Sequence, residues 1–187
     1  MQFLVDLASM KDVESRSLQC VLYGASPISQ HVLEKAMDTF QANFFQVYGL
    51  TETTGGVTML LAEDHEPHGP KAYLLRSCGP PVIGHEIKIV DTETHLECSD
   101  EEVGEIWIRG PQIMRGYWRN PDATKESIDE DGWFKSGDLG YLLEGYLFIH
   151  DRVKDMIISG GENIYPAEVE NALMKHPGVK DAAIIGI

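Results

Sequence analysis

Residues Ser136–Glu168 read SGDLGYLLEGYLFIHDRVKDMIISGGENIYPAE, and residues 46–56 read QVYGLTETTGG. Both stretches place aromatic, hydroxyl and charged side chains among glycines, next to apolar runs. In the shorter stretch, Tyr48 offers a flat face for a base and Thr51 offers a hydroxyl for a phosphate. Glu52 adds a hard oxygen, the ligand type that Mg²⁺ prefers. The shorter stretch therefore predicts a loop that holds a nucleotide.

Two charged residues of the longer stretch fit the same ligand. Asp138 can accept two hydrogen bonds from a ribose diol, each charge-assisted and worth roughly 1.5–3 kcal/mol. Arg152 follows an apolar run and can donate to sugar or phosphate oxygens. Taken alone, Ser-Gly-Asp at 136–138 is also typical of a surface turn, and Tyr48–Glu52 of a tight turn after a buried strand. The order of these residues along the chain favours a nucleotide site beside a small mobile domain.

The first part of the chain predicts a strand–helix–strand unit. An apolar run at Leu18–Tyr23 ends at Gly24–Ser26, and an amphipathic helix of about 12 residues begins at Ser29. A second apolar run, Phe44–Tyr48, ends at Gly49. The carboxyl ends of parallel strands meet at one edge of a sheet, where open α/β sheets bind ligands. We therefore expect the loops after the two runs to converge on one crevice.

From Gly79 onward the pattern changes to short alternating segments separated by proline and glycine. Such a pattern predicts an antiparallel β subdomain with long loops. Its strands are expected at Glu86–Val90, Glu105–Arg109 and Gly145–His150, and segments of the same kind at Gly116–Trp118 and Trp133–Phe134.

A third piece follows the connector Asp151–Lys154. Its expected elements are an extended segment at Met156–Ser159, a turn at Gly160–Gly161, a helix opened by Pro166 and closed by Pro177–Gly178, and a last strand at Val179–Ile187. A helix is also expected at the start of the chain, over residues 3–10.

These patterns predict the α/β class, with α+β character at the level of domains. Residues 1–78 would form the end of an α/β subdomain and residues 79–153 a β-rich subdomain, both within one large domain. Residues 154–187 would begin a small, mobile α+β domain.

Composition excludes some classes of partner. The 187 residues include 15 Lys and Arg against 30 Asp and Glu, a net charge of −15. That charge argues against nucleic acid as a partner, because nucleic acids attract basic surfaces. It also means that a polyanion such as ATP must be met by local donors and a metal ion.

Cysteines and hydropathy point to the cytoplasm. Cys20, Cys78 and Cys98 are odd in number and lack metal-ligand spacing, which favours thiols in a reducing compartment. No apolar run reaches the length of about 18 residues that a membrane span needs, and the first residues do not resemble a signal peptide. Peripheral contact with a membrane stays open, as does the oligomeric state.

Taken together, YGLTET at Tyr48–Thr53, SGD at 136–138 and KDMIISGGENIYPAEVE at Lys154–Glu170 resemble the adenylate-forming superfamily of acyl-CoA synthetases, luciferases and adenylation domains. The resemblance runs from about Leu22 to the end of the chain. In detail it is most similar to the fatty-acyl-CoA ligase branch.

The resemblance implies roles for the loops of the first half. Tyr48 and Gly49 would contact adenine, Thr51 would contact the phosphate of an acyl-adenylate, and Glu52 would hold Mg²⁺. Gly24, Ala25 and Ser26 would line the adenine and acyl side of the pocket, and Thr54–Gly56 the acyl tunnel. Relatives often have a second glycine where Ala25 stands.

It implies roles for the second half as well. Asp138 would clamp the ribose and Arg152 would contact sugar or phosphate oxygens. Lys154 would be the hinge of the small domain. Ser159, Gly160 and Gly161 would approach the nucleotide after rotation, and the two glycines would leave room for the pantetheine arm of coenzyme A.

Two parts that this chemistry uses in the family do not occur in the sequence. One is a Ser/Thr/Gly-rich phosphate loop ending in Pro-Lys-Gly, and the other is the lysine that assists adenylation. The chain is therefore expected to be an internal fragment, inactive alone, with its catalytic residues unassigned.

The implied function is that of an ATP-dependent ligase that joins a medium- to long-chain fatty acid to coenzyme A through an acyl-adenylate, releasing AMP and pyrophosphate. An aryl-acid ligase or a luciferase-like enzyme is the alternative within the class. A catalytically silent nucleotide-binding fragment is the alternative from another class.

Histidines and tryptophans suggest no further site. His65 and His68 stand three residues apart, but their acidic, proline-bearing segment favours a surface loop over a metal site. Trp107, Trp118 and Trp133 are expected to pack within the β subdomain rather than stack on bases.

Overall fold

The structure is a computed structural model, and it describes residues 17–25, 28–159, 162–174, 176, 178–179 and 182–186. The chain forms two compact units, Met1–Val82 and Ile83–Ile187, which are considered one at a time. The helix expected over residues 3–10 lies outside the described residues, as do Ser26, Gly160, Gly161 and Pro177.

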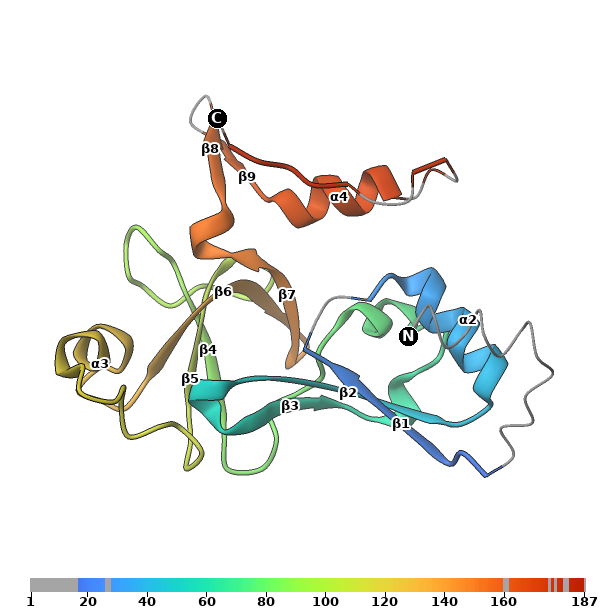
Figure 1. Ribbon diagram of the computed structural model, residues 1–187, viewed down its shortest axis with the longest axis horizontal. Coiled ribbons are helices and arrows are strands. Elements are labelled where there is room, and N and C mark those ends of the chain that lie inside the picture. The colour runs from blue at the N-terminus through green and yellow to red at the C-terminus, as the bar shows by residue number, and fades with distance from the viewer. Residues whose placement is uncertain are drawn as a thin grey trace. The chain divides into compact units, whose positions relative to one another are not determined.

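The first unit contains the predicted strand–helix–strand arrangement. Strand β1 (Cys20–Gly24) leads through helix α2 (Gln30–Phe40) to strand β2 (Asn43–Leu50), and β1 and β2 pair in parallel. The Ser29 hydroxyl caps α2 by accepting from the Val32 amide at 3.4 Å, which fixes where the helix begins. The parallel pairing confirms the crossover predicted from the sequence (Figure 1).

The core of this unit lies between α2 and the sheet. Leu33 and Ala36 of α2 are fully buried against Phe44 of β2 and Leu75. These residues follow the apolar face of the helix, so the periodicity of the sequence determines which side of α2 meets the sheet. Three short 3₁₀ turns complete the unit: η1 (Thr51–Thr53), η2 (Ala62–Asp64) and η3 (Ala72–Arg76).

One strand of the first unit was not predicted. Residues Gly55–Leu60 form β3, which pairs antiparallel with β2 and gives the sheet order β1-β2-β3. The strand opens with Gly-Gly, which is typical of loops, and Thr54 before it has a left-handed backbone (φ 56°). The expectation of a loop over Thr54–Gly56 was therefore wrong for Gly55 and Gly56.

The second unit is built on a four-stranded antiparallel sheet. Antiparallel pairing was expected, but of the ten-residue strand Phe134–Leu143 only Phe134 was predicted as strand. The order of the sheet is β4-β5-β6-β7, with bounds Glu86–Val90, Gly104–Arg109, Phe134–Leu143 and Tyr146–Arg152. Glu144 and Gly145 close the β6–β7 hairpin with φ of 52° and 81°, the geometry that suits the twist of a two-residue hairpin turn. Alternate residues such as Ile106, Ile108 and Leu147 form its core.

One expectation for this unit was wrong, and one helix was not predicted. Gly116–Trp118 lies in a loop rather than in a strand, and the helix α3 (Pro121–Ser127) follows it. The Asn120 side chain caps α3 by accepting from the Ala123 amide at 3.2 Å. Asn-Pro-Asp is a signature of a helix start, so the signal was present in the sequence but was outweighed by the expectation of strands.

The end of the chain forms shorter elements. After β7 come η4 (Val153–Asp155), the hairpin of β8 (Ile157–Ser159) and β9 (Glu162–Ile164), and helix α4 (Pro166–Met174). The strand expected at Val179–Ile187 is absent from the described residues of that range. An apolar run needs a partner strand to satisfy its backbone, and the Ile184 amide instead donates to the Glu170 carboxylate at 2.9 Å.

Within the described part of the chain, no helix combines the length and the apolar character needed to cross a membrane.

Candidate nucleotide site

The end of β1 approaches β2 so closely that only glycine fits there. Gly24 pairs with Val47 of β2, and a Cβ atom at residue 24 would overlap the Val47 carbonyl oxygen. Ala25 follows in the left-handed region, with φ 64°, a conformation that glycine adopts without strain. The pairing brings Gly24, at the end of β1, beside Val47 of β2; the convergence of the two loops on one crevice stays a prediction.

The end of β2 differs from the expectation in one respect. The strand does not stop at Gly49 but runs to Leu50, with a register shift between Tyr48 and Gly49. Gly49 faces Gly56, and a Cβ on Gly49 would overlap the Gly55 carbonyl oxygen. Tyr48 is only 8% exposed, so its side chain is fixed by the core and presents little surface to a ligand.

A buried hydroxyl shapes the turn that follows. The Thr53 hydroxyl accepts from the Leu50 amide at 2.9 Å, and it lies within donating distance of the Leu50 and Gly55 carbonyl oxygens at 3.0 and 2.7 Å. Thr53 is fully buried. In consequence Thr51 is exposed and Glu52 partly buried at the start of η1. Nothing in the spacing of Thr53 along the sequence marks it as the residue that builds this turn.

Magnesium would find one carboxylate at this turn, Glu52. No group of three or more His, Cys, Asp or Glu side chains able to hold a metal occurs among the described residues. Mg²⁺ is commonly bound by one or two carboxylates together with substrate phosphates and water. The residues present therefore fit a Mg²⁺ that arrives with ATP rather than a resident metal.

A polar contact between Tyr23 and His65 fixes β1 close to its carboxyl end. The Tyr23 hydroxyl lies 3.0 Å from Nε2 of His65, whose Nδ1 lies 2.7 Å from the Leu61 carbonyl oxygen. Since a carbonyl oxygen can only accept, Nδ1 carries the proton and Nε2 accepts from the Tyr23 hydroxyl. Burial raises the pKa of Tyr23, with a smaller contribution from Cys78. Burial also lowers the pKa of His65, so both groups stay neutral.

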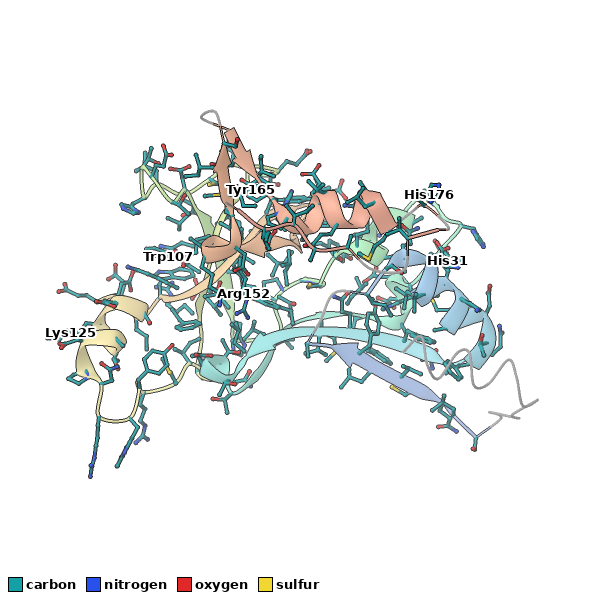
Figure 2. All side chains as sticks on the ribbon, turned by 45° about the horizontal axis from the view of Figure 1, so that its top comes forward. His31, Trp107, Lys125, Arg152, Tyr165 and His176 are labelled. Carbon is teal, nitrogen blue, oxygen red and sulfur yellow. The ribbon has the colours of Figure 1, made fainter. Side chains whose placement is uncertain are left out.

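The second unit places the predicted ribose clamp next to its basic neighbour. Asp138 of β6 and Arg152 of β7 are register partners, and Nε of Arg152 lies 3.2 Å from Oδ1 of Asp138 (Arg152 is labelled in Figure 2). The Asp138 side chain is only 10% exposed, whereas that of Arg152 is 55% exposed. The pair therefore presents a fixed carboxylate and a more accessible guanidinium.

Glu105 positions the segment that carries Asp138, a role that was not predicted. Its carboxylate accepts from the Gly137 amide at 3.0 Å and from the Trp107 indole at 2.9 Å. Gly137 has φ 73°, a left-handed value that favours glycine. The Ser136 hydroxyl accepts from the Asp138 amide at 3.0 Å. No sequence pattern links Glu105 to a glycine 32 residues away; only the pairing of β5 with β6 does.

The remaining predicted residues lie beyond β7. Lys154 is exposed in η4, and Ser159 is exposed at the end of β8. Gly160 and Gly161 fall outside the described residues. The structure thus brings together Gly24, Ala25, Tyr48, Gly49, Thr51 and Glu52 in the first unit and Asp138 with Arg152 in the second. Their contacts with a nucleotide remain predictions.

Two other expectations were partly wrong. Trp107 and Trp133 pack within the unit as expected: the charged groups of Lys88, Arg109 and Lys135 lie 4.3–5.1 Å from the centroids of their rings. Trp118 does not, since it is 86% exposed. His65 is not in a surface loop: it is 7% exposed and packs on the rings of Tyr23 and Phe44. Its local sequence is polar, but its contacts come from strands far away in the chain.

Comparison with known proteins gives consistent results. The family model described as AMP-binding enzyme matches residues 1–118. A fatty acid–[acyl-carrier-protein] ligase of Streptomyces coeruleorubidus is 43% identical over 91% of this chain and 32% of its own length. A 2-succinylbenzoate–CoA ligase of Bacillus licheniformis is 42% identical over 97% of this chain and 36% of its own. The chain spans about one third of the length of these relatives.

Solved structures agree in fold. The o-succinylbenzoate CoA synthetase of Bacillus subtilis, in complex with the acyl-adenylate OSB-AMP, matches all of this chain and 37% of its own, with a TM-score of 0.85 at 38% identity. The amide bond synthetase McbA of Marinactinospora thermotolerans matches with a TM-score of 0.86 at 32% identity, over 98% of this chain and 37% of its own. The matches confirm the predicted α/β class, and the family model together with these relatives shows that the chain belongs to the AMP-binding family of adenylate-forming enzymes.

Proposed function

We propose that the full-length protein is an ATP-dependent ligase that joins a carboxylic acid to coenzyme A. The observation that carries the proposal is the Asp138–Arg152 pair at 3.2 Å, held between two paired strands in the family's characteristic sequence order. The relatives point the same way, since an acyl-adenylate complex and a complex with ATP and magnesium are among the matching structures.

The reaction has two steps. An oxygen of the substrate carboxylate attacks the α-phosphorus of ATP, the bond from that phosphorus to the α,β-bridging oxygen breaks, and pyrophosphate leaves with the electron pair of that bond. A Mg²⁺ ion held at Glu52 would neutralise charge on the phosphate oxygens. The thiol of coenzyme A then loses its proton to the solvent and attacks the acyl carbon. The bond between that carbon and the phosphate oxygen breaks, and AMP leaves with its electron pair. Both steps rest mainly on positioning and on stabilising developing charge.

Each predicted residue contributes binding or orientation. Asp138 accepts from the ribose hydroxyls, and the neighbouring Arg152 holds its carboxylate in place. Arg152 donates to sugar or phosphate oxygens. Thr51 and Glu52, presented by the turn that Thr53 holds, contact the α-phosphate and its Mg²⁺. Lys154 is the hinge at which the small domain turns between the two steps.

The acid substrate is proposed more narrowly as a medium- to long-chain fatty acid. The post-hinge sequence KDMIISGGENIYPAEVE supports this branch, and a fatty-acid ligase is among the relatives. Aryl acids are the alternative, supported by the 2-succinylbenzoate ligases at nearly equal identity.

A panel of carboxylic acids separates these substrates. ATP–pyrophosphate exchange with the full-length protein should be strongest with fatty acids, and a preference for aryl acids would reassign the substrate without changing the reaction. No exchange with any acid, despite AMP binding, would instead favour the silent nucleotide-binding alternative. The 187-residue chain alone is expected to give no exchange, since it contains neither the Pro-Lys-Gly loop nor the adenylation lysine.

The role of Asp138 has its own test. Asp138→Ala should lower kcat/KM for ATP by about 10- to 100-fold, since a charge-assisted hydrogen bond is worth roughly 1.5–3 kcal/mol. Asp122→Ala, on the exposed start of α3, removes the same charge and should leave kcat/KM unchanged. Equal kinetics in the two variants would contradict the ribose clamp.

The role of Lys154 is tested by a backbone change. Lys154→Pro restricts the torsions of residues 153 and 154, so it should slow thioester formation more than adenylation. The two half-reactions are measured separately in the full-length protein, by pyrophosphate exchange and by single-turnover transfer from preformed adenylate. An equal loss in both would count against the hinge.

A further inference from the structure

Two side-chain contacts join the segments before and after the predicted hinge. Before it, β7 ends at Arg152; after it, α4 begins at Pro166. Asp151 accepts a hydrogen bond from the Ala167 amide at 2.9 Å. The ring of His150 packs on the ring of Tyr165 at 4.4 Å between centroids, tilted by 51° (Tyr165 is labelled in Figure 2).

Asp151 acts as the cap of α4 from a distance of 16 residues in sequence. Pro166 has no N–H, so the Ala167 amide is the first donor that the helix offers. The residue before the helix, Tyr165, has no short side-chain oxygen that could cap it locally. Asp151 supplies that oxygen, and its negative charge also interacts favourably with the start of the helix. Its second oxygen accepts from the Arg152 amide at 2.8 Å, which holds the carboxylate in place.

The turn η4 between the two segments has no buried residue, whereas Pro166 at the start of α4 is buried. A cavity of about 520 Å³ lies beside the contacts, lined among others by Lys154, Met156 and Glu170. The hydrogen bond to Ala167 and the ring contact with Tyr165 thus contribute to the attachment of α4 to β7, together with the burial of Pro166.

The run His150–Arg152 also contains a residue of the proposed nucleotide site. Arg152, next to Asp151, pairs with Asp138. The position of α4 is thus coupled through adjacent backbone to the proposed ribose clamp.

We propose that His150 and Asp151 form a clasp that holds α4 in one of the two orientations of the mobile domain. The strength of the clasp then sets how the enzyme divides its time between adenylation and thioester formation. The first statement, that the clasp holds α4 against β7, concerns the chain itself. The two orientations of the mobile domain and the second statement rest on the proposed function. His150 and Asp151 are positioning residues here, because they act through α4 and not on the substrate.

Hydrogen–deuterium exchange of the 187-residue chain tests the first statement. In Asp151→Ala and in Tyr165→Ala, amide exchange in peptides covering residues 163–174 should rise by about 2- to 30-fold, the factor that corresponds to loss of a helix cap. Asp151→Asn keeps an acceptor for the Ala167 amide and should stay close to the wild type. Asp155→Ala is the matched control, because it removes an exposed carboxylate at the hinge.

Exchange in β4, β5 and β6 should be unchanged in all four variants, which separates loss of the clasp from unfolding of the unit. If amide exchange over residues 163–174 is the same in Asp151→Ala and Asp155→Ala, the clasp is refuted, whatever half-reaction rates the full-length enzyme shows.

The half-reactions of the full-length protein test the second statement. Asp151→Ala and Tyr165→Ala should change the ratio of the adenylation rate to the thioester rate in the same direction, by about 2- to 30-fold, while Asp155→Ala leaves it unchanged. An unchanged ratio, or opposite shifts in the two variants, would overturn the coupling. Absence of both half-reactions in the wild type would refute the proposed function and leave the exchange result standing.

Discussion

Strands β2 and β7 each end in a single 3₁₀ turn, and the two turns are held in opposite ways. The turn η1 after β2 is fixed by the fully buried Thr53 hydroxyl and by the close approach of Gly49 to Gly55. The turn η4 after β7 has no buried residue and no side-chain cap; a backbone bond from the Met156 amide to the Arg152 carbonyl oxygen, at 3.2 Å, closes it.

The difference separates two tasks that a nucleotide-binding enzyme must perform. Under the proposed function, η1 presents Thr51 and Glu52 to a phosphate and has to keep its geometry, because small displacements of binding groups are costly. Under the same proposal, η4 contains the hinge and has to change its torsions at low energetic cost. Similar local conformations can therefore be rigid or compliant, and burial of the residues around them decides which.

The largest effect is expected where η1 is packed most tightly. Gly49→Ala would force a methyl group against the Gly55 carbonyl group and should lower the free energy of unfolding by about 3 kcal/mol. The measurement is urea denaturation followed by circular dichroism. Gly186→Ala is the control, since its new Cβ would meet side-chain atoms of Ile157 at an ordinary 3.5 Å. Equal stability of the two variants would mean that β2 and β3 are not held rigidly at this point.

The next effect concerns the buried hydroxyl. Thr53→Val keeps the shape of the side chain but leaves the Leu50 amide without its acceptor, which should cost about 2 kcal/mol. Thr53→Ser keeps the hydroxyl and should recover most of that loss. Exchange of the amides of residues 50–55 should rise only in the valine variant, and a similar rise in both variants would show that the methyl group, not the hydroxyl, fixes η1.

A smaller effect depends on pH and reports on the support beneath the first turn. Because burial lowers the pKa of His65 from its ordinary 6.5, the unfolded chain binds a proton at pH values where the folded chain does not. The free energy of unfolding is therefore fully retained above about pH 6.5 and falls as the pH decreases through the folded-state pKa. Between about pH 7.5 and about pH 5.5, the free energy of unfolding should therefore fall less in His65→Gln than in the wild type. His68→Gln, at an exposed position, should reproduce the wild-type profile.

The smallest effect is expected in the compliant turn. Lys154→Ala changes an exposed side chain of η4 and should alter the free energy of unfolding by no more than about 0.5 kcal/mol. The same denaturation experiment measures it. A loss comparable with that of Gly49→Ala would remove the contrast between the two turns.

Local signals predicted much of this architecture. The Ser29 cap and the apolar face of α2 were readable because they depend on neighbours within a few residues, and so was the alternation of β4 and β5. The parallel pairing of β1 with β2 followed from the length of the crossover. Helix α3 was readable in principle from Asn120 and Pro121, but the surrounding strand-like pattern hid it.

What could not be predicted depends on contacts between distant segments. Glu105 supports Gly137 only because β5 pairs with β6. His65 is buried only because Tyr23 and Phe44 converge on it. Asp151 caps α4 only because the chain folds back after η4. In each case the residue type is ordinary for its local sequence, and its partner is chosen by the fold.

The placement of the tryptophans has an optical consequence. Trp107, Trp118 and Trp133 all belong to the second unit, and the first 82 residues contain none. Intrinsic indole emission will therefore follow the unfolding of the second unit only. A lysine or arginine group lies near each of the three rings. Trp118 is open to water, whereas the other two rings are partly buried, so the emission band should be a composite of shielded and red-shifted components. A quencher such as iodide would suppress the Trp118 component first.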